Sequence, residues 1–517
     1  MKFFTSLLVF LTAGLNSGFC ASVDCVELVS MPNKTVYAYG DSLVTDGAVI
    51  AVGYADGTTR QLPLPADSVC GFNTEKVPAD LCCGISIDCA RKYCSVDLIK
   101  AYIDSLASRS PSFLTLHFAD NENVGVECAF LGQTAERALM NADGSFTNPA
   151  TGLRFLSRKQ VEEIVAYADD KKVQLIPELD MPGHMGGFFK LAKATLGDAF
   201  LTGIAVNENE VPGELNITRP EAVGFASDIL SEYMDMFDGL SVFCIGADEF
   251  WTNYGERTIA FINNMNKLLK QHGFTTRIYN DLIRKEYVDV LDHDIQVLFW
   301  SHDGATNNLS VRDERKRLRA SLPDLQYAGF PIVLTNSYYL YFVPSPRNTN
   351  EHDLAYTVND IKNNWTLAKW DNEYPGGLDT YKGIVGTEVA LWQENASEVS
   401  DEVIIKQMMD MYDAMTSVLQ SNTVRLLLTV NYGGKQTTFP VQVMEPMSCD
   451  VPSVSAGVSK KAKVVLVGNV SCIFAEQPGF ADVFSYEGRC LKSDLKFEKG
   501  ITPLNGFPSR VVLHFSF

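Results

Sequence analysis

The sequence has little that would suit a nucleic acid or a membrane. Its 517 residues include 63 acidic but only 43 basic side chains, which gives a net charge of −20 at pH 7. Phosphate backbones bind to basic faces, so we expect no nucleic-acid partner. Beyond the N-terminal segment, no run of about twenty apolar residues could cross a bilayer, so we expect no membrane span.

Motifs for cofactors and metals are also missing. No GxGxxG motif or P-loop follows the first strand of the expected α/β region, which argues against a doubly wound nucleotide-binding fold. No CxxC pair recurs at the spacing of a zinc site. We therefore expect neither a cofactor nor a metal ion.

The N-terminal segment has the features of a secretory signal peptide. Lys2 precedes an apolar core over 3–15, and small residues follow it up to Cys20 and Ala21. This pattern predicts a signal peptide over 1–20, cleavage near Cys20, and a secreted or lysosome-like location.

The cysteines and glycosylation signals fit that compartment. Disulfides are expected toward the two ends of the chain, although the sequence does not fix their pairing. Twelve cysteines are present, so loss of Cys20 leaves an odd number and one free thiol. Six sequons predict a glycoprotein. The cysteines toward the ends are Cys25, Cys70, Cys82, Cys83, Cys89, Cys94, Cys449, Cys472 and Cys490. The sequons begin at Asn33, Asn216, Asn308, Asn364, Asn395 and Asn469.

The segments at the two ends are rich in β-strand signals. Residues 21–83 show alternating apolar residues and Asp-Gly turns. The run from Tyr54 to Thr59, and the distant run from Tyr432 to Lys435, resemble the start and finish of one bacterial-type immunoglobulin-like domain. We predict either that 424–445 completes this domain or that the two segments are unrelated. Residues 446–517 indicate a small C-terminal β module.

Between these segments, over 84–422, strands alternate with amphipathic helices. Eight strands with helical connections predict an α/β fold, a (β/α)8 TIM barrel flanked by small β-sandwich or β modules. An open, doubly wound sheet is the alternative. The expected strands are 84–88, 112–117, 173–177, 240–245, 276–279, 295–300, 331–336 and 383–391.

Polar and aromatic residues stand at nearly every expected strand end, where barrels form their active sites. The fourth strand is followed by the adjacent carboxylates Asp248 and Glu249, which alone would indicate only a solvated acidic turn. Carboxylates, aromatic rings and one arginine together suit a sugar, because its ring faces stack on aromatics and its hydroxyls need polar partners. The other residues at strand ends are Asp88, Arg91, His117, Asp120, Asp180, His184, Trp300, Tyr339, Tyr341, Trp392 and Glu394.

Five motifs in order resemble the β-N-acetylhexosaminidases of glycoside hydrolase family 20. The strongest are Gly246-Ala247-Asp248-Glu249 and Leu179-Asp180-Met181-Pro182-Gly183-His184. The remaining three are Asp88-Cys89-Ala90-Arg91, His117-Phe118-Ala119-Asp120 and Trp392-Gln393-Glu394. The resemblance covers about 84–420.

The resemblance implies substrate-assisted, retaining hydrolysis of an oligosaccharide or glycoconjugate with a terminal β-linked N-acetylhexosamine. Glu249 would be the general acid and then the base. Asp248 would accept the acetamide N–H, and Tyr339 would bind the acetamide oxygen. Further implied roles are hydroxyl binding by Arg91, Glu394 and Tyr341, ring and acetamide walls from Trp300 and Trp392, and support from Asp120, Asp180 and His184.

Some positions depart from the family pattern. Cys244 replaces a histidine, Asn121 replaces a second aspartate, and Tyr341 replaces a hydroxyl-binding Asp or Asn. The α/β domain that usually precedes the barrel is also missing. Two alternatives remain, a lectin-like barrel that has lost catalysis and a retaining glycosidase with Glu394 as nucleophile. The gluco or galacto preference, the linkage and the oligomeric state are not predicted.

Overall fold

The computed structural model divides the described chain into two units, Glu75–Val424 and Met1–Thr74 with Arg425–Phe517. The predicted signal peptide and the sequons at Asn33 and Asn469 lie outside the described residues. The described residues are 22–30, 36–37, 46–64, 69–109, 111–206, 213–346, 351–371, 377–378, 380–421, 424–432, 435–443, 462–467, 470–475, 479–485, 490–497, 500–503 and 511–516.

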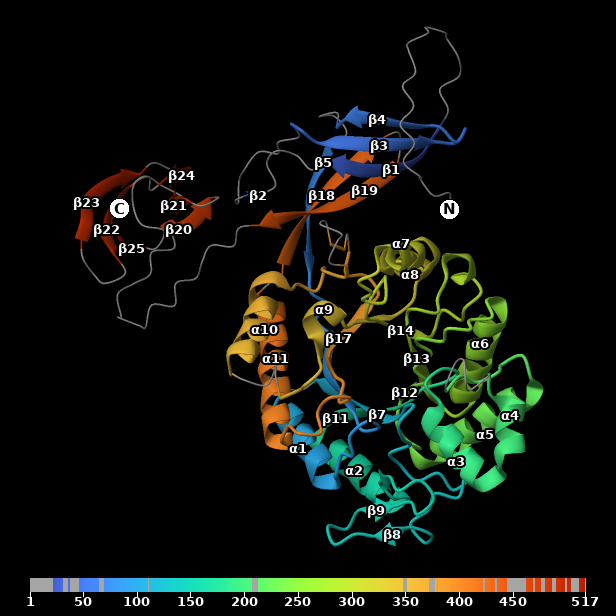
Figure 1. The fold of residues 1–517 in the computed structure, drawn as a ribbon. Coiled ribbons are helices and arrows are strands. Elements are labelled where there is room, and N and C mark those ends of the chain that lie inside the picture. Colours follow the sequence, from blue (N-terminus) through green and yellow to red (C-terminus); the bar gives the residue numbers. More distant parts are fainter. Residues whose placement is uncertain are drawn as a thin grey trace. The chain divides into compact units, whose positions relative to one another are not determined.

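The unit Glu75–Val424 contains a closed parallel barrel with helices around it (Figure 1). Every neighbouring pair of its strands is parallel, and β17 closes the sheet by pairing with both β15 and β6. The barrel prediction is confirmed, and the open-sheet alternative is wrong. The barrel strands are β6 (Cys82–Asp88), β7 (Ser112–Ala119), β11 (Val173–Leu179), β12 (Val242–Cys244), β13 (Thr275–Tyr279), β14 (Gln296–Phe299), β15 (Ile332–Leu334) and β17 (Ile384–Leu391).

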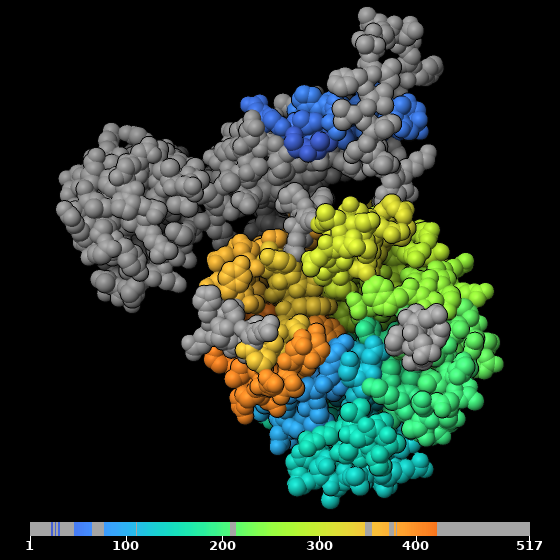
Figure 2. Space-filling view, in the orientation of Figure 1, coloured from blue at the N-terminus to red at the C-terminus, as the bar shows by residue number. Residues whose placement is uncertain are grey.

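Burial explains why the barrel strands are short apolar runs. All eight residues of β7 are buried, as expected for a parallel strand covered on both faces. The first and last barrel strands pair from Cys82 opposite Gly386 to Ile87 opposite Leu391. Figure 2 accordingly shows the blue and orange ends of the barrel segment side by side.

The helices pack one face against the barrel and begin at recognisable caps. In α1 the buried residues Ile99, Tyr102, Ile103 and Leu106 recur at helical spacing. The side chain of Ser157 caps α2 in a capping box with Gln160. The helices are α1 (Val96–Ala107), α2 (Arg158–Lys171), α3 (Gly186–Leu196), α4 (Asp198–Ile204), α5 (Pro220–Met236), α6 (Glu256–Gln271), α7 (Leu309–Leu318), α8 (Leu322–Ala328), α9 (Ser337–Leu340), α10 (Glu351–Asn364) and α11 (Asp401–Ser421).

Small strands complete the barrel unit. The antiparallel strands β8 (Leu139–Met140), β9 (Phe146–Thr147) and β10 (Arg154–Phe155) form a separate sheet between β7 and α2 in the sequence. A short strand, β16 (Tyr341–Phe342), pairs with the end of β17, opposite Ala390 and Leu391. This pairing fixes the backbone of Tyr341 at the carboxyl end of the barrel.

The other unit is built of β-sheets. One antiparallel sheet has the order β1-β3-β4, from β1 (Val23–Ser30), β3 (Val49–Tyr54) and β4 (Thr59–Pro63). A second sheet, in the order β2-β19-β18-β5, combines β2 (Val36–Tyr37) and β5 (Val69–Lys76) with β18 (Val424–Tyr432) and β19 (Lys435–Val443). Strands from both sides of the barrel thus share one sheet, as a split domain requires. Its immunoglobulin-like family stays a prediction.

The C-terminal residues form two three-stranded sheets. Their orders are β20-β21-β24 and β23-β22-β25. The strands are β20 (Ala462–Val467), β21 (Val470–Ala475), β22 (Gly479–Ser485), β23 (Cys490–Phe497), β24 (Gly500–Pro503) and β25 (Val511–Ser516).

The structure corrects part of the disulfide prediction. Cys82, Cys83, Cys89 and Cys94 are free thiols, although we expected disulfides toward this end of the chain. The first two begin β6, and the other two are buried beside it. These positions belong to the packed barrel, which needs no covalent link to hold them. Within the described parts of the chain, no helix has the length and apolar character needed to cross a membrane.

Candidate active site

The loop after β12 carries the two central carboxylates on an unusual backbone. Gly246, Ala247 and Glu249 have φ values of 63°, 58° and 41°, in the left-handed region that residues with a Cβ seldom adopt. A side chain at Gly246 would overlap the carboxylate of Asp180. The backbone N–H of Glu249 donates to Asp281 Oδ2 over 2.9 Å. The loop therefore holds Asp248 and Glu249 on a backbone that Gly246 makes possible and that Asp281 anchors.

Asp248 has an acceptor atom without a partner. Its side chain is only 15% exposed, and its Oδ1 is buried with no hydrogen-bond donor in the described structure. Burial raises the pKa of Asp248 to about 7, although the nearby His184 opposes that shift. A buried, unpaired carboxylate oxygen is costly unless a ligand N–H or O–H reaches it.

Glu249 shares a histidine with Asp248. His184 Nε2 lies 3.5 Å from Glu249 Oε2 and 3.8 Å from Asp248 Oδ2. The nearby His184 holds the pKa of Glu249 below its ordinary value, and burial only partly offsets this effect. Burial lowers the pKa of His184, but Asp248 and Asp120 outweigh it and raise the pKa well above the ordinary value. His184 is therefore a cation between two carboxylates.

Asp120 connects this histidine to a second, deeper one. Asp120 Oδ1 lies 3.2 Å from His184 Nδ1, and Asp120 Oδ2 lies 3.1 Å from His117 Nε2. Burial raises the pKa of Asp120, but the hydrogen bonds from both histidines outweigh it and keep the pKa below its ordinary value. Asp120 and His184 thus form a polar pair beside Glu249.

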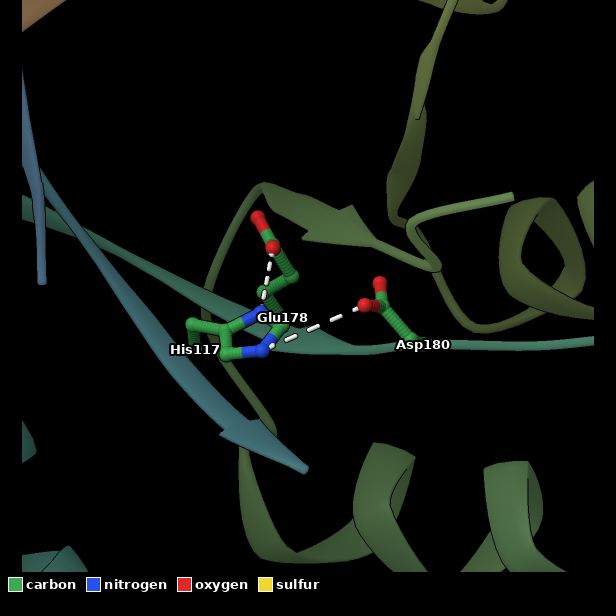
Figure 3. A group of neighbouring side chains, drawn as sticks. All are labelled: His117, Glu178 and Asp180. Atoms are coloured by element: carbon green, nitrogen blue, oxygen red, sulfur yellow. Dashed lines mark hydrogen bonds and ion pairs between the residues drawn. The ribbon is translucent and has the colours of Figure 1, made fainter. Parts of the chain in front are cut away.

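His117 lies between two buried carboxylates, as Figure 3 shows. Its Nδ1 is 2.6 Å from Glu178 Oε1, and its Nε2 is 3.9 Å from Asp180 Oδ2. Burial raises the pKa of Asp180 well above its ordinary value, and the charge of Asp248 raises it further. Asp180 is therefore close enough to Asp248 for the charge of one carboxylate to affect the ionisation of the other, and its supporting role stays a prediction.

Among the described residues, two groups have the ligand types of a metal site. One is His117, Glu178 and Asp180, and the other is Asp120, Asp180 and His184. In the first group the carboxylates face opposite ring nitrogens of His117, whereas a histidine binds a metal through one nitrogen only. This arrangement suits a hydrogen-bonded chain of charges better than a metal centre.

Arg91 lies at the edge of the same group, at the start of the loop after β6. Its guanidinium is 2.6 Å from Asp120 Oδ2 and 3.2 Å from Asp88 Oδ2. It also lies over the ring of Trp392, 5.4 Å from the centroid. Its side chain is 16% exposed. Arg91 is thus an ion-pair member and also one wall of the site.

Three aromatic rings line the mouth of the barrel. Tyr341 stacks on Trp300 with a centroid distance of 5.9 Å and an interplanar angle of 8°. It also meets Trp392 edge-on at 5.8 Å. Burial raises the pKa of Tyr341 well above its ordinary value, and the charge of Asp248 adds to the shift. The Tyr341 hydroxyl therefore lies within the electrostatic field of Asp248.

Tyr339 lies in different surroundings. Its hydroxyl accepts a hydrogen bond from Lys369 Nζ over 2.5 Å, and Lys369 also lies 4.8 Å from the centre of its ring. Its ring meets Tyr338 edge-on. The structure thus places Tyr341, rather than Tyr339, with the tryptophans and Asp248. That Tyr339 reaches the acetamide stays a prediction, and its hydroxyl is already bound to Lys369 in the structure. Tyr339 lies in the short helix α9, whereas Tyr341 begins β16.

Two residues that the sequence analysis did not identify follow β13. Asp281 is buried and accepts the backbone N–H of Glu249 and the Nε1–H of Trp300, the latter over 3.3 Å. Asn280 accepts the backbone N–H of Trp300 over 2.9 Å and donates to the Ser301 carbonyl. Both residues end the fifth strand, so the rule used for the other strand ends would have identified them.

The remaining predicted residues are at the last strand. Glu394 is exposed two residues beyond Trp392, whose ring packs edge-on against His117 at 5.2 Å. Trp392 Nε1 is buried without an acceptor among the described residues. The mouth of the barrel thus offers apolar walls with unpaired polar atoms, as a polyhydroxylated ligand requires.

Comparison with known proteins agrees with this geometry. The sequence model described as glycosyl hydrolase family 20, catalytic domain, matches residues 83–409. The chain belongs to glycosyl hydrolase family 20. The matched residues coincide with the barrel, from β6 to α11.

Relatives of this family 20 chain include proteins of known structure. Dispersin B is 35% identical with a TM-score of 0.62, and the match covers 65% of this chain and 98% of that one. The β-hexosaminidase subunit A1 of Dictyostelium discoideum is 24% identical over 67% of this chain and 60% of that protein. A lacto-N-biosidase of Bifidobacterium bifidum is 24% identical over 51% of this chain and 23% of that protein. The chain therefore spans less than two thirds of these two curated relatives.

Proposed function

We propose that this family 20 protein is an exo-acting β-N-acetylhexosaminidase that removes terminal N-acetylglucosamine or N-acetylgalactosamine with retention of configuration. The observation that carries the proposal is the unpaired Oδ1 of Asp248 beside Glu249. An acetamide N–H is a donor of the right kind for that oxygen. Several curated relatives are named as hexosaminidases, which supports the same substrate class.

In the first step the substrate's acetamide oxygen attacks the anomeric carbon, and the glycosidic C–O bond breaks. Glu249 gives its proton to the leaving oxygen. Asp248 accepts the acetamide N–H and stabilises the positive charge that develops in the oxazolinium ring. No protein nucleophile is needed, so Glu394 does not take that part.

In the second step water opens the oxazolinium ring. Glu249, now ionised, takes a proton from the water molecule. The oxygen of that water bonds to the anomeric carbon, the bond from that carbon to the acetamide oxygen breaks, and the acetamide is regenerated. Two displacements at the same carbon give retention. His184 holds the Glu249 carboxylate in place during both proton transfers.

Substrate binding favours the protonation state that this reaction needs. In the free protein the pKa of Asp248 is raised to about 7, while that of Glu249 is lowered. The reaction needs the opposite order, with Asp248 ionised and Glu249 protonated. A hydrogen bond from the acetamide N–H stabilises the ionised form of Asp248, and its negative charge then raises the pKa of Glu249.

We assign the acetamide oxygen to Tyr341. Its ring is fixed between Trp300 and Trp392, and its hydroxyl lies in the field of Asp248. A neutral phenol donates a hydrogen bond, and the raised pKa keeps Tyr341 neutral. The two tryptophans then wall the sugar and its acetamide, while Arg91 and Glu394 bind the outer hydroxyls.

Two further parts of the proposal concern the compartment and the configuration of the sugar. The predicted signal peptide and sequons support secretion or entry into a lysosome-like compartment. The proposal includes both the gluco and the galacto configuration.

The test compares p-nitrophenyl N-acetyl-β-glucosaminide with the matching β-glucoside. We expect release of nitrophenol from the first only, because the glucoside lacks the acetamide that acts as nucleophile. Glu249→Gln should abolish turnover, and Glu256→Gln, the same change at an exposed carboxylate, should not. Turnover of both substrates would point to a protein nucleophile instead. Binding of N-acetylglucosamine without turnover of either would favour the lectin-like alternative.

A further inference from the structure

A cleft opens beside Glu249, and its lining does not include Trp300, Tyr341 or Trp392, the aromatic walls of the sugar site. It has a volume of about 330 Å³, within the range of roughly 300–1,000 Å³ that small ligands occupy. Glu249, Trp251, Arg315 and Arg319 are among the residues that line it. The proposed hydrolysis leaves this cleft unexplained, because it uses only the terminal sugar.

Trp251 is an exposed aromatic ring on an anchored backbone. The residue is 65% exposed, although it lies only two positions beyond the catalytic Glu249. Its backbone N–H donates to the buried Glu214, which also accepts from Thr252. The Arg315 guanidinium lies over the indole, 5.4 Å from its centroid. Exposed tryptophans held in place in this way are suited to stack on the face of a sugar.

The arginines of the cleft have unused hydrogen-bonding capacity. Arg319 has a side chain only 13% exposed, and its Nη1 is buried with no acceptor among the described residues. Its Nη2 lies 3.6 Å from Asp281 Oδ2. Arg315 Nη1 donates to the carbonyl oxygen of Asp303, and no carboxylate of the described residues forms an ion pair with it. Both guanidinium groups are suited to an anionic ligand, because their planar N–H pairs match the oxygens of a carboxylate or a sulfate.

The acidic residues of the cleft do not cancel this charge. Asp281 already accepts from Glu249 and Trp300 and pairs with Arg319. Glu249 is neutral when it acts as the proton donor. Glu314 is exposed to solvent, and a third arginine, Arg284, also lines the cleft.

We propose that this cleft is a leaving-group subsite for an anionic sugar, whose ring stacks on Trp251 while its carboxylate or sulfate binds Arg315 and Arg319. The inference rests on the proposed function, because Glu249 must then protonate the oxygen that joins the two sugars. The terminal N-acetylhexosamine lies against Trp300 and Tyr341, and the leaving sugar lies in the cleft beside Glu249. The substrate class is a glycan in which a terminal N-acetylhexosamine is β-linked to a uronic acid or a sulfated hexose.

The test measures kcat/KM for the full chain on three disaccharides with terminal N-acetylglucosamine. The second sugar is N-acetylglucosamine, glucuronic acid or sulfated galactose. We expect the better anionic substrate to exceed the neutral one by about tenfold, since hydrogen bonds to charged groups are strong. The two anionic substrates show whether a carboxylate or a sulfate is preferred. High salt should reduce the preference.

Arg315→Gln should remove most of this preference while the neutral disaccharide reports any general effect on Glu249. Trp251→Ala should lower kcat/KM for the neutral and the anionic disaccharides and should lower it less for the aryl glycoside. Arg317→Gln is the matched control, since Arg317 is exposed on the same helix and does not line the cleft. Equal kcat/KM for neutral and anionic disaccharides would overturn the inference. If Arg315→Gln lowered kcat/KM equally for the neutral and the anionic disaccharides, that result would also overturn the inference. No release from the aryl N-acetylglucosaminide would instead refute the proposed function.

Discussion

The assignment of the acetamide to Tyr341 rather than Tyr339 can be decided by two matched substitutions. Tyr341→Phe and Tyr339→Phe each remove one phenolic oxygen and keep the ring. In Tyr341→Phe the stack on Trp300 at 5.9 Å and the edge contact with Trp392 should persist. The difference between the two variants therefore isolates the hydroxyl.

The expected magnitudes follow from what each hydroxyl contacts. The Tyr341 hydroxyl lies near Asp248 and would donate to the atom that becomes the nucleophile. Loss of one fixed donor of this kind typically lowers the rate by about 10²–10³-fold. The Tyr339 hydroxyl is bound to Lys369 over 2.5 Å. We expect its loss to change kcat/KM by less than about threefold, equivalent to roughly 0.7 kcal/mol of transition-state energy.

The assay uses p-nitrophenyl glycosides with an acetamide or a trifluoroacetamide group. The fluorinated group is a weaker nucleophile, so the ratio of the two rates reports how far the acetamide is activated. Tyr341→Phe should change both kcat and this ratio, whereas Tyr339→Phe should change neither by much. Thermal unfolding of both variants checks that the barrel is intact.

The reverse pattern would refute the assignment. If Tyr339→Phe lowered kcat/KM by about 10²-fold and Tyr341→Phe stayed active, the acetamide would be bound by Tyr339, as the family resemblance implies. If both variants lost activity but the ratio of the rates on the acetamide and trifluoroacetamide substrates did not change, neither hydroxyl would contact the nucleophile.

Three other predictions test the surroundings of the site. His184→Gln removes a cation that lowers the pKa of Asp248 and of Glu249, so both pKa values should rise. Both limbs of the pH profile of kcat/KM should then move to higher pH. The alkaline limb of the unchanged protein is expected near pH 7. Gly246→Ala, at a φ of 63°, should displace Asp180 and remove most activity at saturating substrate. Phe243→Ala, at a fully buried position, should lower the free energy of unfolding by about 3–5 kcal/mol in urea titrations.

The barrel could be predicted because its strands are buried on both faces and its helices on one. The helix α7 could not be predicted, for the opposite reason. None of its residues is buried, so its sequence has no apolar periodicity that would indicate a helix. Yet α7 carries Arg315, which lines the cleft beside Glu249. A polar helix at a barrel mouth is positioned by the loops around it, and those contacts are invisible in the sequence.

The sequence predicted which strand ends form the site, but not which side chains at those ends face it. Asp248, Glu249 and His184 meet because each lies on the loop that follows a barrel strand. Tyr339 and Tyr341 follow the same strand two positions apart, and only the pairing of β16 with β17 decides which one faces the tryptophans. A pairing of two residues at Tyr341 and Phe342 is too short to leave a pattern in the sequence.

Cys244 shows how distance along the chain can mislead. It lies four residues before the acidic pair, yet its neighbour across the sheet is Glu178, deep in the barrel. From Glu178 the contacts run through His117, Asp120 and His184 to Glu249, over 2.6, 3.1, 3.2 and 3.5 Å. A thiol is a weaker donor than the imidazole that the family resemblance predicts at this position, and Glu178 Oε2 has no donor in the described structure. The substitution therefore acts at the far end of the chain of charges, where Glu178 Oε1 is bound by His117 and by the Tyr279 hydroxyl while Oε2 has no donor among the described residues.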